Sequence, residues 1–245
     1  MTTDYDPIAE QYQRSKQQPW RTHIEAFSLL QLAGDTRGQH VLDVACGEGF
    51  YTRQLKHPGT ASVTGLDLSA SMIELARTQE AAHQLGIHYV VGDARQLPYT
   101  ETFDLVVAAY LLNYAHDRQE LQTMCDSIAR CLKPGGRFVT VNSSPALDFS
   151  RAPSYRSYGF EIKVVGAFGE GAPLTWRFHL EDGTFSLENY YLDTAIHESA
   201  LRAAGFREVQ WPAPRLSPAA LAGPAAEQWE LFLAHSPVAF LECRK

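Results

Sequence analysis

The sequence predicts an α/β fold in which helices cover both faces of a mostly parallel β-sheet. Three observations predict it: short unbroken apolar runs recur between residues 36 and 143, helical segments separate these runs, and a turn with two glycines follows the first run. Parallel strands that are buried on both faces are apolar along their whole length, and the helices that connect them cover those faces.

The expected strands of this sheet span residues 40–46, 61–68, 88–93, 103–110 and 137–143. The clearest connecting helix begins at Asp117, which together with Glu120 matches a capping box, and it ends before the Lys-Pro-Gly-Gly stretch at 133–136. Ser71 and Glu74 predict a similar start for the helix that follows the second strand.

Residues 144–192 interrupt this alternation. They are rich in aromatic residues and turn formers, and the pair Asp182-Gly183 between two strand-like runs predicts a β-hairpin after the fifth strand. A helix over residues 193–204 and strands within 206–212 and 237–244 are expected to complete the fold. Ligands of open α/β sheets bind outside the carboxyl ends of the strands, so the hairpin is expected to contribute substrate contacts.

Composition excludes several classes of protein. The chain has 245 residues, is 45% hydrophobic and carries a formal net charge of −7 without a basic block, so a single domain that does not bind nucleic acid is expected. No stretch resembles a secretory signal, and none approaches the roughly 18 apolar residues of a spanning helix. We therefore expect a cytoplasmic protein without membrane contact, whose four scattered cysteines are buried free thiols.

Acidic residues accompany three successive strands of the expected sheet. Asp43 lies in the first strand, Asp67 ends the second and Asp93 ends the third. The carboxyl ends of parallel strands meet at one edge, where a carboxylate can bind the hydroxyls of a ribose and another can accept the exocyclic amine of adenine. Gly47 and Gly49 permit a sharp turn and a close approach of the backbone to a ligand. The pattern favours an adenosine site.

The same turn argues against a phosphate-bearing ligand. A dinucleotide site carries G-x-G-x-x-G, whereas here Glu48 stands between the two glycines, where it would repel a pyrophosphate. A P-loop is absent too. A nicotinamide oxidoreductase, which would share this sheet, is therefore disfavoured, and the zwitterionic tail of a methionine fits the turn better.

Five motifs in succession resemble those of class I S-adenosylmethionine-dependent methyltransferases: VLDVACGEG, GLDLS, GDARQLP, FDLVVAAYLLNY and LKPGGRFV. The resemblance implies a Rossmann-like sheet of seven strands with an antiparallel last hairpin, S-adenosylmethionine as cofactor and S-adenosylhomocysteine as product. It divides the chain into an N-terminal helical lid (1–35), a cofactor-binding core (36–143), a substrate-side insertion (144–192) and a C-terminal helix with strands (193–245).

The family's cofactor contacts can be transferred by position. In the core they fall on Asp43, Ala45, Gly47, Gly49, Asp67, Leu68, Met72, Asp93, Ala94, Ala109 and Tyr110. Ala45 replaces a glycine that is common in the family. Residues 5–21 resemble a subset in which a lid tyrosine covers the cofactor, which implies that role for Tyr12 and a further contact for Arg21. Met72 alone would equally fit a core position, and Arg21 a solvated helix charge.

The segment IAEQYQRSK followed by PWR resembles the toxoflavin synthase group of azapteridine N-methyltransferases. That resemblance implies N-methylation, twice in succession, of a 1,6-didemethyltoxoflavin-type azapteridine. The alternatives left open are O- or C-methylation of another small aromatic metabolite and a non-catalytic S-adenosylmethionine-binding protein. No nucleic-acid partner is expected, and the chain is expected to act as a monomer or homodimer.

Aromatic residues are the candidates for contact with a flat substrate. They are Tyr5, Trp20, Trp176 and Tyr191, although Trp20, Trp176 and Tyr191 would equally fit packing. An acidic heterocyclic N–H needs little base, so no indispensable catalytic residue is expected. The candidates for orienting the acceptor are Tyr12, Tyr110, Asn113 and His179, the last of which also fits an exposed strand position. Asn113 and Tyr114 stand where metal-dependent relatives place carboxylates, so no metal is expected.

Overall fold

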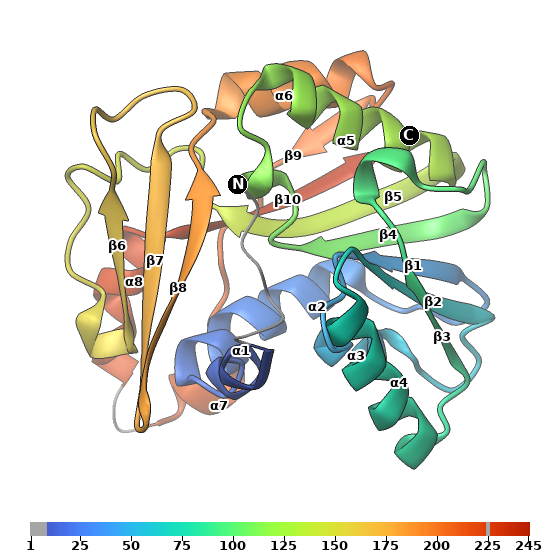
Figure 1. Cartoon of the computed structure of the whole chain (residues 1–245), viewed down its shortest axis with the longest axis horizontal. Coiled ribbons are helices and arrows are strands. Elements are labelled where there is room, and N and C mark those ends of the chain that lie inside the picture. Colours follow the sequence, from blue (N-terminus) through green and yellow to red (C-terminus); the bar gives the residue numbers. More distant parts are fainter. Residues whose placement is uncertain (1–8, 224–225) are drawn as a thin grey trace.

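A computed structural model describes residues 9–223 and 226–245 of the chain. Its main element is a seven-stranded sheet in the order β3-β2-β1-β4-β5-β10-β9 (Figure 1). The strands are β1 (His40–Val44), β2 (Ser62–Asp67), β3 (Ile87–Val91), β4 (Phe103–Ala109), β5 (Leu132–Ser143), β9 (Glu208–Gln210) and β10 (Val238–Arg244). The first five are parallel, and β10 runs antiparallel to both β5 and β9. The predicted α/β class and the seven-stranded sheet are confirmed.

Two sets of helices cover the two faces of this sheet (Figure 1). On one face lie α5 (Arg118–Cys131) and α6 (Thr194–Ala203). On the other lie a π-helix (Arg21–Ala26), α2 (Phe27–Ala33), α3 (Phe50–Leu55) and α4 (Ala70–His83). Alternate strand residues face opposite layers, so that Leu42 and Val106 pack toward α5 whereas Val41 and Val107 pack toward the other set.

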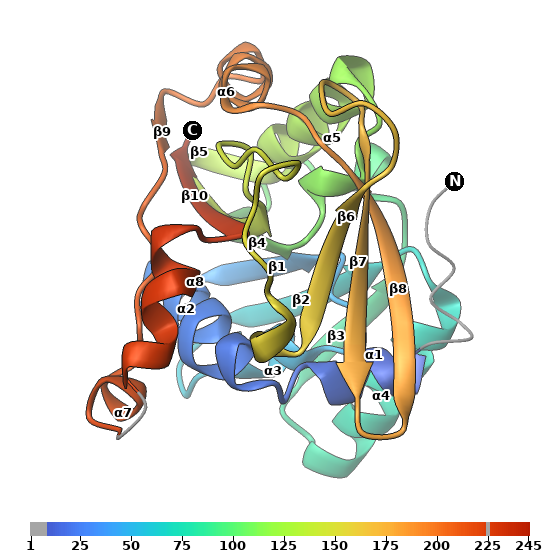
Figure 2. The ribbon, with the colours of Figure 1, turned by 90° about the vertical axis from the view of Figure 1, so that its left-hand side faces the viewer.

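A second, three-stranded antiparallel sheet follows β5. It consists of β6 (Phe160–Val164), β7 (Pro173–Leu180) and β8 (Gly183–Tyr190), in that order. The hairpin predicted around Asp182-Gly183 is the β7–β8 turn, but β6 was not predicted, because its pairing with β7 spans a loop that carries no local signal. Figure 2 shows this sheet in front of the first helix, α1 (Ala9–Ser15).

Helix starts were predicted with mixed success. Asp117 caps α5 as expected, with one carboxylate oxygen accepting the N–H groups of Gln119 and Glu120 at 2.9 Å. The predicted start of α4 at Ser71 was wrong, because the hydroxyl of Ser69 accepts the N–H of Met72 and caps the helix two residues earlier.

The C-terminal region holds helical turns that the sequence did not predict. They are α7 (Pro218–Leu221), a 3₁₀ turn (Ala226–Trp229) and α8 (Glu230–Ala234). The strand expected from residue 137 begins at Leu132, because the Lys-Pro-Gly-Gly stretch is already part of β5. All four cysteines are buried and free, as predicted. Within the described part of the chain, no helix is both long and apolar enough to span a bilayer.

Candidate functional site

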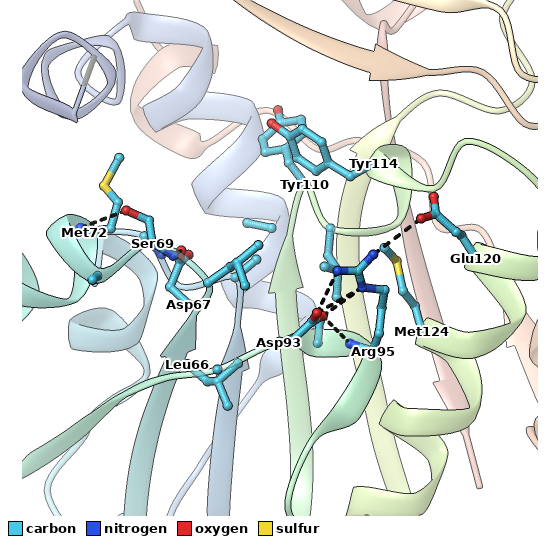
Figure 3. Close-up of a pocket in the computed structure, with 18 of the residues that line it drawn as sticks. Leu66, Asp67, Ser69, Met72, Asp93, Arg95, Tyr110, Tyr114, Glu120 and Met124 are labelled. Atoms are coloured by element: carbon cyan, nitrogen blue, oxygen red, sulfur yellow. Dashed lines mark hydrogen bonds and ion pairs between the residues drawn. The ribbon is translucent and has the colours of Figure 1, made fainter. Parts of the chain in front are cut away.

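A pocket of about 640 Å³ opens at the carboxyl ends of β1, β2, β3 and β4 (Figure 3). Every cofactor contact expected from the sequence lines it except Arg21, Asp43 and Gly49. The sequence reasoning missed other lining residues, namely Leu66, Ser69, Ala70, Gly92, Arg95, Leu111, Tyr114, His116, Glu120 and Met124. The volume lies within the range of about 300–1,000 Å³ that is usual for small-molecule sites.

Asp67 presents a fixed carboxylate at the end of β2. Its two oxygens accept backbone N–H groups, one from Gly47 at 2.8 Å and one from Ser69 at 2.9 Å. Burial raises the pKa of Asp67, although these N–H bonds oppose the shift. A carboxylate has about four acceptor sites, so capacity remains for a ribose hydroxyl. Asp67 also ties the glycine turn to β2.

The turn after β1 uses left-handed backbone at Ala45 (φ 57°), Gly47 (φ 56°) and Gly49 (φ 85°). Glycine adopts this conformation without a steric penalty, which explains why it is common at the position of Ala45. Gly49 does not line the pocket, and a Cβ there would lie 2.9 Å from the ζ-carbon of Tyr89. Its role is therefore close packing, and the expected close approach to a ligand falls on Gly47.

Asp43 lies beneath the pocket and does not line it. One of its oxygens accepts the hydroxyl of Thr52 at 2.6 Å, which joins β1 to α3. The other has no hydrogen-bond partner among residues 9–223 and 226–245. Burial raises the pKa of Asp43 to about 7, the Thr52 bond opposes this shift, and the charge of Asp67 adds to it.

This pKa predicts a pH dependence of stability. Between the ordinary pKa of 3.8 and about 7, the folded state holds a proton at Asp43 that the unfolded chain has lost. The stability that this site contributes therefore falls as the pH rises through that window and is constant above it. We expect Asp43→Asn to remove a slope of up to about 1.3 kcal/mol per pH unit, measured by urea unfolding at several pH values in the window.

Asp104→Asn is the matched control for this prediction. Burial raises the pKa of Asp104, but hydrogen bonds from the His40 N–H and from Lys133 outweigh it, so the net shift is downward. A carboxyl with a lowered pKa contributes stability above its ordinary pKa and loses that contribution as the pH falls below it. Asp104→Asn should therefore leave the slope of stability against pH within the window unchanged. Unfolding curves of Asp43→Asn that run parallel to wild type across the window would contradict the assignment.

Asp93 lines the pocket just after β3 and is paired with Arg95. The guanidinium donates to its carboxylate at 2.7 Å and at 3.0 Å, and Arg95 also reaches Glu120 of α5 at 3.5 Å (Figure 3). Hydrogen bonds from Arg95 lower the pKa of Asp93, so the group is ionised. Arg95 thus fixes the orientation of the Asp93 carboxylate, and an amine bound at this edge would donate to the same carboxylate.

Comparisons with known proteins agree with this geometry. A family profile described as a methyltransferase domain matches residues 41–136. The demethylmenaquinone methyltransferase of Tropheryma whipplei is 31% identical over 189 residues, a match that covers 75% of this chain and 73% of that protein. The chain belongs to the class I S-adenosylmethionine-dependent methyltransferase family.

Other methyltransferases match over shorter lengths or at lower identity. The ubiquinone biosynthesis O-methyltransferase of Coxiella burnetii is 38% identical over 43% of this chain and 45% of its own length. The chain thus spans about half the length of several curated relatives that it matches. The structure of the CcbJ methyltransferase from Streptomyces caelestis aligns with a TM-score of 0.71 at 22% identity, over 99% of this chain and 98% of that one, which shows the shared fold.

A charged cluster lies in the N-terminal region of this methyltransferase, within residues 16–25. Glu25 of the π-helix is fully buried; it accepts two bonds from Nη1 of Arg21, at 3.0 and 3.1 Å, and the Nζ of Lys16 lies 3.6 Å away. The hydroxyls of Tyr51 and Tyr110 also donate to Glu25. Burial raises the pKa of Glu25, but the two cations and the two hydroxyls outweigh it, so the net shift is downward. The sequence reasoning missed Lys16 and Glu25, because nothing in the local sequence shows that they are buried.

A second, small compartment adjoins the cofactor pocket. Both cavities are lined by Tyr12, Tyr110 and Tyr114, so the tyrosines form the boundary between them. The remaining residues of the second compartment are Arg21, Trp176, Phe178, Leu187 and Asn189. Arg21, which was expected to contact the cofactor, and Trp176, which was expected to contact the substrate, both line this compartment.

Other predicted substrate contacts lie elsewhere. The side chain of Trp20 is core: its ring packs on Phe160 and its indole N–H donates to Gln18 at 3.0 Å. The hydroxyl of Tyr191 donates to a backbone carbonyl of the insertion, and its ring lines neither cavity. Both are corrections, because long-range packing occupies these side chains. Tyr5 lies outside the described residues.

Of the four candidates for orienting the acceptor, two line the cavities and two do not. His179 lies beside Glu161 on the face of β7 opposite Trp176, so it is directed away from both cavities. Asn113 is buried and lines neither cavity, and its amide has no partner in the part of the chain that is described. Tyr12 and Tyr110 do line both cavities, but the hydroxyl of Tyr110 is bound to Glu25. Tyr110 therefore contributes its ring.

Proposed function

We propose that the protein transfers the methyl group of S-adenosylmethionine to a ring nitrogen of a small planar heterocycle. The observation that carries the proposal is the pair of cavities that meet at Tyr12, Tyr110 and Tyr114. One cavity has the acids of an adenosine site at the strand ends, and the other is small and lined by aromatic side chains. With the cofactor in the first cavity and the acceptor in the second, the two reactants would meet at this boundary, as group transfer requires.

The residues of the first cavity suit the cofactor. Asp67 offers acceptor capacity to the ribose, Asp93 offers it to the adenine amine, and the glycine turn leaves room at Gly47 for the methionine part. When bound, the cofactor supplies an electrophilic methyl group. Among the described residues, no group of three or more His, Cys, Asp or Glu side chains is placed to hold a metal ion.

Side chains at the boundary would position the acceptor and exclude water. Burial raises the pKa of Tyr110 well above its usual value, and its contact with Glu25 adds to the shift, so its hydroxyl stays protonated. It is therefore unsuited to accept a proton from the substrate. An acceptor with an acidic N–H loses its proton to water before transfer, which removes the need for a protein base.

The resemblance of the N-terminal segment supports a particular substrate class. We propose a 1,6-didemethyltoxoflavin-type azapteridine, methylated on nitrogen in two successive steps, by a cytoplasmic monomer or homodimer. Rings such as Trp176 and Phe178 can stack on a flat fused heterocycle and tolerate its rotation between the two steps. The names of the relatives favour a second candidate, methylation of a quinone-type ring.

The test is to incubate the enzyme and S-adenosylmethionine with 1,6-didemethyltoxoflavin or with demethylmenaquinol and to follow product masses. Successive gains of one and two methyl groups on the azapteridine alone would support the first candidate, and a gain on the quinol alone would support the second. Cofactor binding by calorimetry without transfer to either acceptor would favour a non-catalytic binding protein or another acceptor class. Asp67→Asn, which weakens the cofactor site, is the control for enzyme-dependent transfer.

A further inference from the structure

Two residues that line the second compartment each carry a buried N–H donor without a hydrogen-bond partner. The donors are Nε of Arg21 and Nε1 of Trp176, whose side chains are each only 2% exposed. Neither atom meets an acceptor within residues 9–223 and 226–245. Because leaving a buried donor unpaired is unfavourable, two of them beside one cavity indicate a ligand that brings its own acceptor atoms.

The orientation of both donors is fixed by their surroundings. Nη1 of Arg21 is held by Glu25, and the guanidinium lies 4.7 Å from the ring of Trp20 and 5.0 Å from that of Phe178. The indole of Trp176 stacks on Phe160 at 5.3 Å with an interplanar angle of 15°. Each donor is therefore held in place by its neighbours in the closed compartment.

The charge near the compartment favours an anion. Arg21 and Lys16 carry two positive charges, and Glu25 supplies one negative charge to both of them. All three side chains are almost completely buried, so this set carries a net positive charge in a medium of low dielectric constant. Asp67 lies in the other cavity, beyond the boundary tyrosines.

We propose that the second compartment binds a planar ring through an anionic oxygen on its edge, with Arg21 and Trp176 as the donors. The proposal rests on the proposed function and specifies its acceptor as an aromatic carboxylate or an ionised ring carbonyl. The two donors come from different elements, the π-helix and β7, so the bound oxygen would bridge them. The compartment measures about 10 Å³, room for about one water molecule, so binding requires these two elements to separate.

The experiment measures binding of 2-naphthoate and of its neutral isostere 2-naphthamide to the full chain saturated with S-adenosylhomocysteine. We expect naphthoate to bind at least roughly tenfold more tightly, because hydrogen bonds to a charged acceptor are stronger than those to a neutral one. Trp176→Phe keeps the ring and removes only the N–H, and it should weaken naphthoate binding by roughly tenfold while changing naphthamide binding much less. Arg21→Lys, which keeps the charge and loses Nε, should act in the same direction.

Trp211→Phe is the matched control. This tryptophan lines neither cavity, and its N–H already has a partner, Glu198 at 3.1 Å, so naphthoate affinity should not change. Equal affinities for naphthoate and naphthamide, or a Trp176→Phe variant with wild-type naphthoate affinity, would overturn the proposal. If Trp176→Phe weakens S-adenosylhomocysteine binding as much as it weakens naphthoate binding, the donors belong to the cofactor site, and this result would also overturn the proposal. This experiment measures binding and not methyl transfer. If the protein prefers naphthoate over naphthamide but transfers no methyl group, the proposed function is refuted and the binding proposal stands.

Discussion

Replacing Glu25 with alanine is expected to lower the free energy of unfolding by roughly 3–5 kcal/mol, the usual effect of breaking a buried ion pair. The substitution leaves the buried cations of Arg21 and Lys16 without their counter-charge and removes the acceptor of the Tyr51 and Tyr110 hydroxyls. Urea unfolding followed by circular dichroism measures the change. A dependence on salt should be weak, because the cluster is shielded from solvent.

Glu170→Ala is the matched control for this prediction. Glu170 forms two hydrogen bonds with Arg118, at 2.7 and 2.8 Å, but the two side chains are 45% and 65% exposed. Exposed pairs of this kind contribute little to stability, because water and salt screen them. Equal losses in the two variants would show that water reaches Glu25 and that the cluster is open in solution.

Asp67→Ala is expected to weaken S-adenosylhomocysteine binding by roughly 10- to 150-fold, which corresponds to the loss of about 1.5–3 kcal/mol for hydrogen bonds to a charged group. The carboxylate would bind the ribose, and it also holds the N–H of Gly47 and thereby the turn. Isothermal titration calorimetry measures the affinity. Asp104→Ala, which removes a carboxylate that pairs with Lys133 outside the pocket, should leave the affinity unchanged.

A ligand comparison separates the two roles of Asp67. If its carboxylate binds the ribose, wild type should prefer S-adenosylhomocysteine over the 2′-deoxyribose analogue, and Asp67→Ala should lose that preference. If Asp67 acts only through the turn, the preference persists at lower affinity for both ligands. Unchanged affinity for S-adenosylhomocysteine itself would remove Asp67 from the site.

Most residues of the larger pocket were predictable to lie together, because their positions follow from local chain geometry. Asp67 and Asp93 end neighbouring parallel strands, and the turn at Gly47 joins the first strand to its helix. Parallel pairing brings such strand ends to one edge whatever the rest of the chain does. The Arg95–Asp93 pair was missed although the two residues are close in sequence, since a residue's type does not show which neighbour it binds.

The helix starts illustrate a limit on the local scale. Asp117 had one plausible cap position, and the prediction was confirmed. The start of α4 was predicted at Ser71, but Ser69 caps it, because the chain leaves β2 at Asp67 and enters α4 within three residues. Residue spacing alone therefore predicts the first residue of a helix poorly, since that residue depends on how the preceding strand ends.

By itself, the sequence determined the α/β class, the alternation of strands and helices along the chain and the acids at the strand ends, because these depend on periodicity and on short connections. Only the tertiary structure brought together the residues of the second compartment. Arg21 and Trp176 are far apart in the chain, and nothing near either one distinguishes a donor beside a cavity from Trp20, whose N–H is satisfied by Gln18. The burial of Glu25 likewise depends on Tyr51 and Tyr110 arriving from other elements. Such contacts arise from packing between segments that are distant in the chain, and the periodicity of the residues does not predict them.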